Sequence, residues 1–201
     1  MSPGCLSEGA VRALDNGLAW ASDPVARGWP QTRQEFEAVV EDLQDRLVRY
    51  AFLRLGSLQE AEDIVQEVFV RAYADRRNRR AVTQVRSYLY RMAANACTDL
   101  LRKRERSGVP VETVEAMNLP DGRKSSFEIA SALEELQRIE AVLKRLPGRQ
   151  SEVIRLRVFD ELPFVEIAEV LGRSPATVKS RFRYGLRKLR KIVRNEWEVR
   201  K

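Results

Sequence analysis

Residues 162–189 read LPFVEIAEVLGRSPATVKSRFRYGLRKL, and this stretch decides the fold of the carboxyl-terminal half of the chain. Ala168, Gly172 and Val178 stand at the spacing of a helix-turn-helix. That motif needs a small residue where two helices cross, a glycine in the tight turn and an apolar anchor in the second helix. The stretch therefore predicts two helices joined by a sharp turn.

Signals for helix starts mark both sides of this turn. Pro163 and Pro175 each suit the first turn of a helix, and Ser174 is a favourable N-cap residue for the second helix. The apolar positions of the second helix share one face, and the opposite stripe consists of Lys179, Ser180, Arg183, Tyr184 and Arg187. Because Arg and Lys donate hydrogen bonds to guanine in the major groove, the stripe predicts a DNA-reading helix. The alternative is a helical hairpin with a cationic face in solvent.

The charge of the chain is concentrated in two blocks. The net charge is +7, but residues 71–106 hold 11 basic and 3 acidic residues, and residues 173–201 hold 11 basic and 2 acidic residues. Two basic blocks in an acidic background predict two phosphate-contacting surfaces and an acidic face for another partner. For either block alone, an Arg-rich helix in solvent is an equally good interpretation.

The amino-terminal half carries a helical period with capping signals. Thr32 with Glu35, and Ser57 with Glu60, have capping-box spacing, and Gly56 separates the two periodic segments. A third helix or a bent pair is predicted from about residue 84 to residue 106, and further helices are predicted over 133–146, 153–159, 162–171 and 175–196. No alternating strand pattern of useful length occurs.

These patterns predict an all-α fold of two small helical domains joined by a flexible linker. We expect the domains over residues 31–106 and 132–201, and the linker over 107–131, where the period fails among Gly and Pro residues. For the extension, residues 1–30, three interpretations stay open: disorder, an early start codon, or a regulatory contact through Trp20 and Trp29.

The composition argues against several classes of function. The 201-residue chain has no histidine and only two cysteines, Cys5 and Cys97, so a structural zinc site would lack ligands. There is no phosphate-binding glycine loop and no nucleophile motif, so we expect no catalytic residues, no metal and no cofactor. No apolar run reaches the roughly 18 residues of a membrane span, and residues 1–33 lack the pattern of a signal peptide. These features predict a cytoplasmic protein without membrane insertion.

The stretch EAEDIVQEVFVRAY, residues 60–73, resembles the region 2.2 signature of extracytoplasmic-function (ECF) sigma factors, subunits of bacterial RNA polymerase. The resemblance implies that a polar helix face docks on the clamp helices of the polymerase β′ subunit. The residues that it assigns to binding core polymerase are Asp63, Gln66, Glu67 and Phe69. Without the resemblance, an acidic stripe on a helix is more often simply solvated.

Residues 85–106, VRSYLYRMAANACTDLLRKRER, are similar to regions 2.3 and 2.4 of the same family. There a loop and a helix capture an unpaired, flipped base of the minus-ten promoter element. The resemblance assigns this role to Tyr88, Tyr90, Arg91 and Asn95, whose rings, cation and amide suit stacking on a base and reading its edge. Tyr88 stands where many relatives have tryptophan, and packing in a helical core is an equally ordinary role for either tyrosine.

Residues 133–193 resemble region 4, whose helix-turn-helix reads the minus-35 element. The resemblance places Lys179, Ser180, Arg183, Tyr184 and Arg187 against bases or backbone, and Arg157 against a phosphate. Position 184 is often basic in relatives, which weakens the assignment of a base contact to Tyr184.

The resemblance spans roughly residues 34–193 and implies an alternative sigma factor that directs core polymerase to specific promoters and promotes melting, without being an enzyme. The implied partners are core polymerase through its β′ clamp helices and β flap, promoter DNA, and an anti-sigma factor. Two other functions stay open from the residues alone: a stand-alone helix-turn-helix regulator and a sigma-interacting adaptor protein.

Overall fold

The computed structural model describes residues 28–75, 82–107 and 138–199, and the regular elements in these ranges are helices. They are α2 (Arg33–Leu55), α3 (Leu58–Ala74), α4 (Val85–Ser107), α6 (Gly148–Ile154), the π-helix η2 (Arg155–Phe159), α7 (Phe164–Leu171) and α8 (Pro175–Val199). The predicted all-α fold is confirmed for this part of the chain. Almost all of the predicted linker, 107–131, and residues 1–27 of the predicted extension lie outside the described residues.

Local signals explain where α2 and α3 begin and where α2 ends. The Thr32 hydroxyl accepts a hydrogen bond from the Glu35 amide at 3.1 Å, and the Ser57 hydroxyl accepts one from the Glu60 amide at 3.4 Å. Gly56 ends α2 in the left-handed region, at φ 77°, which L side chains rarely adopt. The two capping pairs predicted from the sequence are confirmed.

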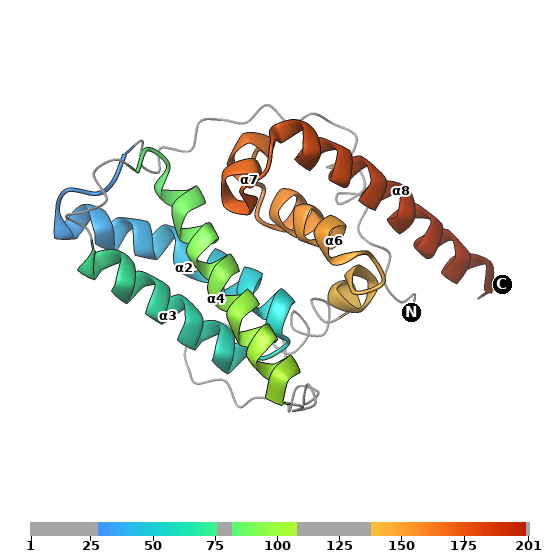
Figure 1. Ribbon diagram of the computed structural model, residues 1–201, viewed down its shortest axis with the longest axis horizontal. Helices are drawn as coiled ribbons and strands as arrows, with labels where there is room; N and C mark the ends of the chain where they lie inside the picture. Colours follow the sequence, from blue (N-terminus) through green and yellow to red (C-terminus); the bar gives the residue numbers. More distant parts are fainter. Residues whose placement is uncertain (1–27, 76–81, 108–137, 200–201) are drawn as a thin grey trace, which may run out of the picture.

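Helices α2, α3 and α4 pack together around an apolar core. Figure 1 shows these three helices on the side of the molecule away from α8. Leu43, Leu47 and Leu89 are fully buried within it. Burying one such side chain contributes about 1.5–3 kcal/mol, so these positions supply much of the stability of this half.

The residues immediately before α2 are tied to the start of α4. The Gly28 amide donates a hydrogen bond to the Thr83 carbonyl at 3.0 Å, and the Trp29 ring is only 4% exposed. Trp29 meets the Tyr88 ring edge-on, with centroids 5.7 Å apart. The end of the extension predicted over residues 1–30 is therefore part of the folded core.

The segment after α6 differs from the prediction. The apolar period over 153–159 predicts one helix, but the structure changes to a π-helix at Arg155. This wider turn ends at the buried Asp160 and brings it, with the Phe159 carbonyl, against Arg49 on α2. The contact joins residues more than a hundred positions apart, so no local sequence pattern encodes it.

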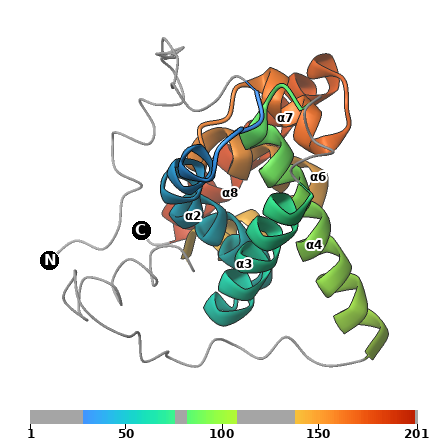
Figure 2. The same ribbon diagram turned by 90° about the vertical axis from the view of Figure 1, so that its left-hand side faces the viewer.

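The two halves of the described chain pack directly against one another. Helix α7 lies against α4 (Figure 2). The π-helix η2 contacts α2. One apolar core crosses the contact, since Val65 and Leu89 belong to the same buried cluster as Leu156 and Ile167. A smaller cluster, formed by Leu143, Leu146 and Ile154, joins the helical residues 138–143 to α6.

Candidate functional site

The turn between α7 and α8 has the geometry that the sequence predicts. Gly172 adopts the left-handed conformation at φ 59° and closes α7. The Ser174 hydroxyl accepts a hydrogen bond from the Thr177 amide at 3.2 Å, and Pro175 is the first residue of α8. Val178 is completely buried beneath the turn. The helix-turn-helix is therefore fixed by its own caps and by one apolar anchor.

The polar stripe of α8 lies on the surface, as predicted. Its exposed members are Lys179, Ser180, Arg183, Tyr184 and Arg187. Tyr184 is 54% exposed, and the Arg187 guanidinium lies 5.6 Å from the centre of its ring. The structure thus brings these five residues together on one cationic surface.

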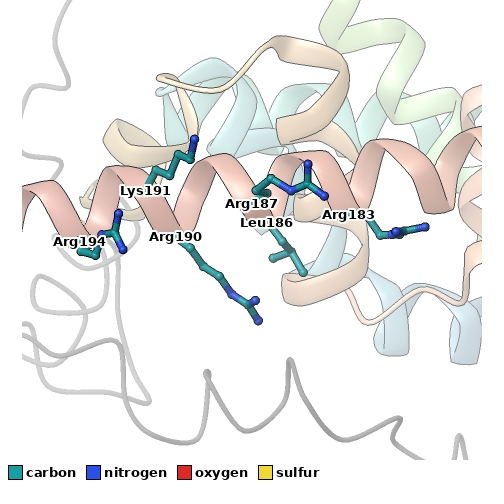
Figure 3. Close-up of a pocket in the computed structure, with 6 residues that line it drawn as sticks. All are labelled: Arg183, Leu186, Arg187, Arg190, Lys191 and Arg194. Carbon is teal, nitrogen blue, oxygen red and sulfur yellow. The ribbon is translucent and has the colours of Figure 1, made fainter.

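The cationic surface extends farther along α8 than the predicted stripe. Arg190, Lys191 and Arg194 line a shallow depression together with Arg183, Leu186 and Arg187 (Figure 3). These three additional cations could have been predicted from the sequence, since they continue the spacing of three to four residues that defines one helix face.

Arg157 is held by contacts at the start of α7. Its Nη1 donates a hydrogen bond to the Leu162 carbonyl at 3.1 Å, and its guanidinium lies 5.0 Å from the centre of the Phe164 ring. Burial lowers the pKa of this guanidinium. In this conformation Arg157 stabilises the entry to α7, and it is not among the residues that line the depression on α8.

Helix α3 presents a separate polar surface. Asp63, Gln66 and Glu67 are exposed, and Glu67 forms an ion pair with Arg71 at 2.5 Å. Phe69, predicted to belong with them, is only 8% exposed.

Phe69 instead packs edge-on against Phe36, with ring centroids 6.4 Å apart. It is therefore a core residue in this structure, because it falls on the apolar side of the helix. Val70, which is not among the predicted residues, is 61% exposed and adds an apolar group beside Gln66 and Glu67.

The four residues predicted to bind minus-ten DNA divide between the surface and the core of the molecule. Arg91 and Asn95 are exposed and lie one turn apart on α4, and Tyr88 is half-buried and packs edge-on against Trp29. Tyr90 is fully buried.

The Tyr90 ring packs edge-on against Tyr50, with centroids 5.4 Å apart, and burial raises its pKa. In this structure Tyr90 cannot stack on a base, because its ring is enclosed by the contact between the two halves. The sequence left this outcome open, since a helical period cannot separate a core tyrosine from a binding tyrosine.

Two further features bear on the class of protein. None of the helices in the described residues is both long and apolar enough to cross a membrane. Within the same ranges, no group of three or more acidic or cysteine side chains is placed to hold a metal ion.

Comparison with known proteins agrees with the geometry. The model for Sigma-70 region 2 matches residues 39–107, and the model for Sigma-70, region 4 matches residues 136–189. The ECF RNA polymerase sigma factor SigW of Bacillus subtilis (strain 168) is 32% identical over 168 residues, which cover 80% of this chain and 89% of SigW.

Two solved structures have a similar fold. CnrH, in complex with the cytosolic domain of CnrY, matches with a TM-score of 0.63 and 22% identity over 92% of this chain and 95% of that chain. The sigma factor RpoE, in complex with the anti-sigma factor NepR from Bartonella quintana, matches with a TM-score of 0.62 and 20% identity over 80% of this chain and 98% of that chain.

Both halves of the chain match sigma-70 regions in their expected order, and SigW is similar over most of its length. The family membership predicted from residues 60–73 is therefore confirmed. The chain belongs to the ECF sigma factor family and is an alternative sigma factor that directs RNA polymerase to promoters.

Proposed function

We propose that the exposed face of α3 binds core polymerase while α4 and α8 contact the two promoter elements. The observation that carries this proposal is the arrangement of α3. Asp63, Gln66 and Glu67 share an exposed face, whereas Ile64 and Val65 anchor the same helix in the core. Three polar groups held rigidly by a buried opposite face form a preorganised docking surface.

The polymerase contact is assigned to the clamp helices of β′, as the family resemblance implies. Glu67 and Asp63 supply negative charge, and the exposed Val70 supplies apolar area at the same surface. Phe69 acts indirectly in this proposal, since its buried ring fixes the helix that displays the polar groups. A second polymerase contact, with the β flap, is assigned to residues 132–201.

The minus-ten contact is assigned to the exposed side of α4. Arg91 supplies a cation for the backbone, Asn95 an amide for a base edge, and Tyr88 an aromatic surface beside them. Binding of the unpaired strand favours melting, because it removes melted DNA from the equilibrium with the duplex. Tyr90 supports this surface from the core.

The minus-35 contact is assigned to the cationic surface of α8. Lys179 and Arg183, near the start of the helix, are placed to read bases, and Ser180, Tyr184 and Arg187 contact bases or backbone. Arg190, Lys191 and Arg194 extend the surface with cations suited to phosphates. Arg157 would join them only after leaving the Leu162 carbonyl.

The remaining assignments follow from the family. Sigma factors are initiation factors rather than catalysts, so we assign no reaction to this chain, and we place it in the cytoplasm with polymerase and DNA. An anti-sigma partner is proposed because the similar RpoE binds one. We assign 31–106 and 132–201 as the two functional domains, with the linker 107–131 passing toward the polymerase active site.

Titration of the fluorescently labelled chain with sigma-free core polymerase tests the assignment of α3. Asp63→Lys and Glu67→Lys are expected to weaken binding by about tenfold or more, since they reverse charge within a complementary interface. Glu169→Lys, an equal charge change at an exposed position of α7, is the matched control. Affinities equal to that of the control would overturn the assignment.

A further inference from the structure

The segment that immediately precedes α2 is fastened at both of its ends. The Gly28 amide donates a hydrogen bond to the Thr83 carbonyl at 3.0 Å, just before α4 begins. The Gln31 side chain donates to the Trp29 carbonyl at 2.6 Å, and the Gln31 amide donates to the Glu35 carboxylate at 2.7 Å in the first turn of α2. The segment therefore bridges the start of α2 to the start of α4.

This segment places the Trp29 ring between α2 and α4. The ring is only 4% exposed, and its centroid lies 6.4 Å from that of Phe36 on α2 and 5.7 Å from that of Tyr88 on α4. The indole Nε1 is buried without a hydrogen-bond partner among the described residues. The indole therefore acts through its shape and apolar surface, and not through a polar contact.

Tyr88 belongs to the side of α4 that is assigned to minus-ten DNA. It lies in the first turn of the helix, three residues before Arg91 and seven before Asn95, and residues at these spacings share one helix face. Arg91 and Asn95 are exposed, whereas Tyr88 is half-buried. One part of the Tyr88 side chain is thus open to the surface of Arg91 and Asn95, while Trp29 packs against its ring.

The rings of Trp29 and Tyr88 are perpendicular, with an interplanar angle of 89°. Edge-to-face pairs are a preferred arrangement of aromatic rings, because the positive edge of one ring meets the negative face of the other. Such a contact resists rotation of the Tyr88 ring. A base that stacks on tyrosine lies parallel to the ring, so the plane that Trp29 fixes decides whether Tyr88 can hold a base.

A ring held in advance also binds more tightly than a mobile ring. A free side chain loses rotamer entropy when a ligand immobilises it, and this loss lowers the affinity. Trp29 restrains Tyr88 as the chain folds, because Trp29 is itself buried against Phe36. The entropy of Tyr88 is therefore lost before DNA binds, and its loss does not weaken the complex.

We propose that Trp29 is a positioning residue of the minus-ten site, which holds the Tyr88 ring in the plane that stacks on an unpaired base. The segment before α2 then serves DNA binding without touching DNA. The inference rests on the assignment of α4 to minus-ten DNA. It goes beyond that assignment, because it gives a role in base capture to a residue outside α4.

Single-stranded DNA that lacks one base tests this role. The holoenzyme is titrated with an oligonucleotide that carries the melted strand of a promoter that it uses, and an abasic site replaces each base of the minus-ten region in turn. At the position whose base stacks on Tyr88, loss of the base is expected to weaken binding of the natural chain by about tenfold. That position is identified by Tyr88→Ala, which is expected to abolish the penalty there and at no other position.

Trp29→Ala is expected to reduce the penalty at the same position to about twofold or less, because Tyr88 is present but no longer held in the stacking plane. Tyr88→Ala combined with Trp29→Ala is expected to have no further effect at that position, since both substitutions remove one interaction. Trp29→Phe keeps a ring in contact with Tyr88 and is expected to restore most of the penalty.

Leu43→Ala is the matched control for a general loss of packing. Leu43 is fully buried on α2, about two helical turns beyond Phe36, and its truncation also leaves a cavity in the core. It is expected to lower the thermal stability and to leave the abasic penalty unchanged at every position. Thermal unfolding shows whether each variant is folded. If Trp29→Ala is not, Trp29→Leu replaces it, because leucine fills space without supplying a ring.

Two results would contradict the proposal. One is a penalty in Trp29→Ala that equals that of the natural chain at the Tyr88 position, which would make Trp29 a purely structural residue. The other is a penalty that Leu43→Ala reduces as much as Trp29→Ala does, which would attribute the effect to a loosened core.

The outcome is separable from that of the proposed function. A penalty that depends on Tyr88 but not on Trp29 contradicts this inference and leaves the assignment of α4 intact. If no penalty depends on Tyr88, its assignment to an unpaired base fails, and the role of Trp29 fails with it. A chain that supports no initiation with core polymerase contradicts the proposed function itself.

Discussion

At the scale of single residues, Asp160 has the most unusual environment in the described chain. It is almost completely inaccessible between the two halves, and burial raises its pKa to about 7 despite the ion pair with Arg49. The other groups that face it are the Tyr90 hydroxyl on α4 and the Glu152 carboxylate on α6. The Asp160 Oδ2 has no hydrogen-bond partner among the described residues.

This environment predicts that the packing of the two halves depends on pH. Asp160 has a raised pKa when packed and a pKa near 3.9 when the halves separate, so protonation favours packing. The contribution of protonated Asp160 to the free energy of packing is complete below about pH 4 and is lost as the pH rises through about 7. The chain contains no histidine, whose ordinary pKa would fall in the same window.

Distances between spin labels on cysteines introduced at the exposed positions Ala38 of α2 and Lys188 of α8, recorded at about pH 6 and about pH 8, check this prediction. The natural chain is expected to hold a larger population of separated halves at the higher pH. Asp160→Asn, a neutral side chain of the same shape, is expected to stay packed at both values. Equal pH dependence in the two proteins would show that another group is responsible.

Gly185 is the second residue of interest at this scale. It lies where α8 crosses α6, and the crossing leaves no room for a side chain. A Cβ added there would come within 2.8 Å of Ile154 Cδ1 and within 3.3 Å of Gln150 Cβ. Since Ile154 is itself buried, Gly185→Ala is expected to lower the free energy of unfolding by about 1–3 kcal/mol. Gly148→Ala, which has open space around it, is the control, and denaturant titration compares the two. Equal stabilities would contradict the tight crossing.

At the scale of elements, α8 combines a buried anchor with a cationic surface, and the two are separable by substitution. Lys179→Ala and Arg183→Ala are each expected to weaken holoenzyme binding to its minus-35 element by about 1–3 kcal/mol if the side chain reads a base. Both residues are exposed, so thermal stability is expected to be unchanged. Lys188→Ala, exposed but outside the depression of Figure 3, is the control.

The salt dependence of DNA binding tests whether the other cations of the α8 surface contact phosphates. Arg190→Ala and Arg194→Ala are expected to weaken binding to all DNA sequences about equally. Each is expected to reduce the slope of log affinity against log salt by about one, as for a lost phosphate contact. An unchanged slope would place these arginines outside the DNA interface.

For each helix, the sequence predicted the features that depend on residues close by along the chain. The starts of α2, α3 and α8 follow from Thr32, Ser57 and Ser174, each of which caps its own helix. The exposed stripe of α8 follows from its period.

The π-helix η2 and the burial of Tyr90 could not be predicted, because both depend on the opposite half of the molecule. The pair of Arg86 and Glu166 joins residues 80 positions apart, and nothing in either local sequence specifies the other.

At the scale of the whole molecule, the chain carries three separate surfaces. The polar face of α3 is assigned to polymerase, the exposed side of α4 to melted DNA and the cationic side of α8 to duplex DNA. The first two remain exposed in the packed arrangement, because α7 covers the side of α4 that carries Arg86.

The most direct test of this account is transcription from a genomic library by sigma-free core polymerase supplied with the purified chain. The account predicts transcripts from discrete start sites that require the chain and are weakened by Glu67→Lys. The absence of any chain-dependent start site, from core polymerase that is active with another sigma factor, would contradict it.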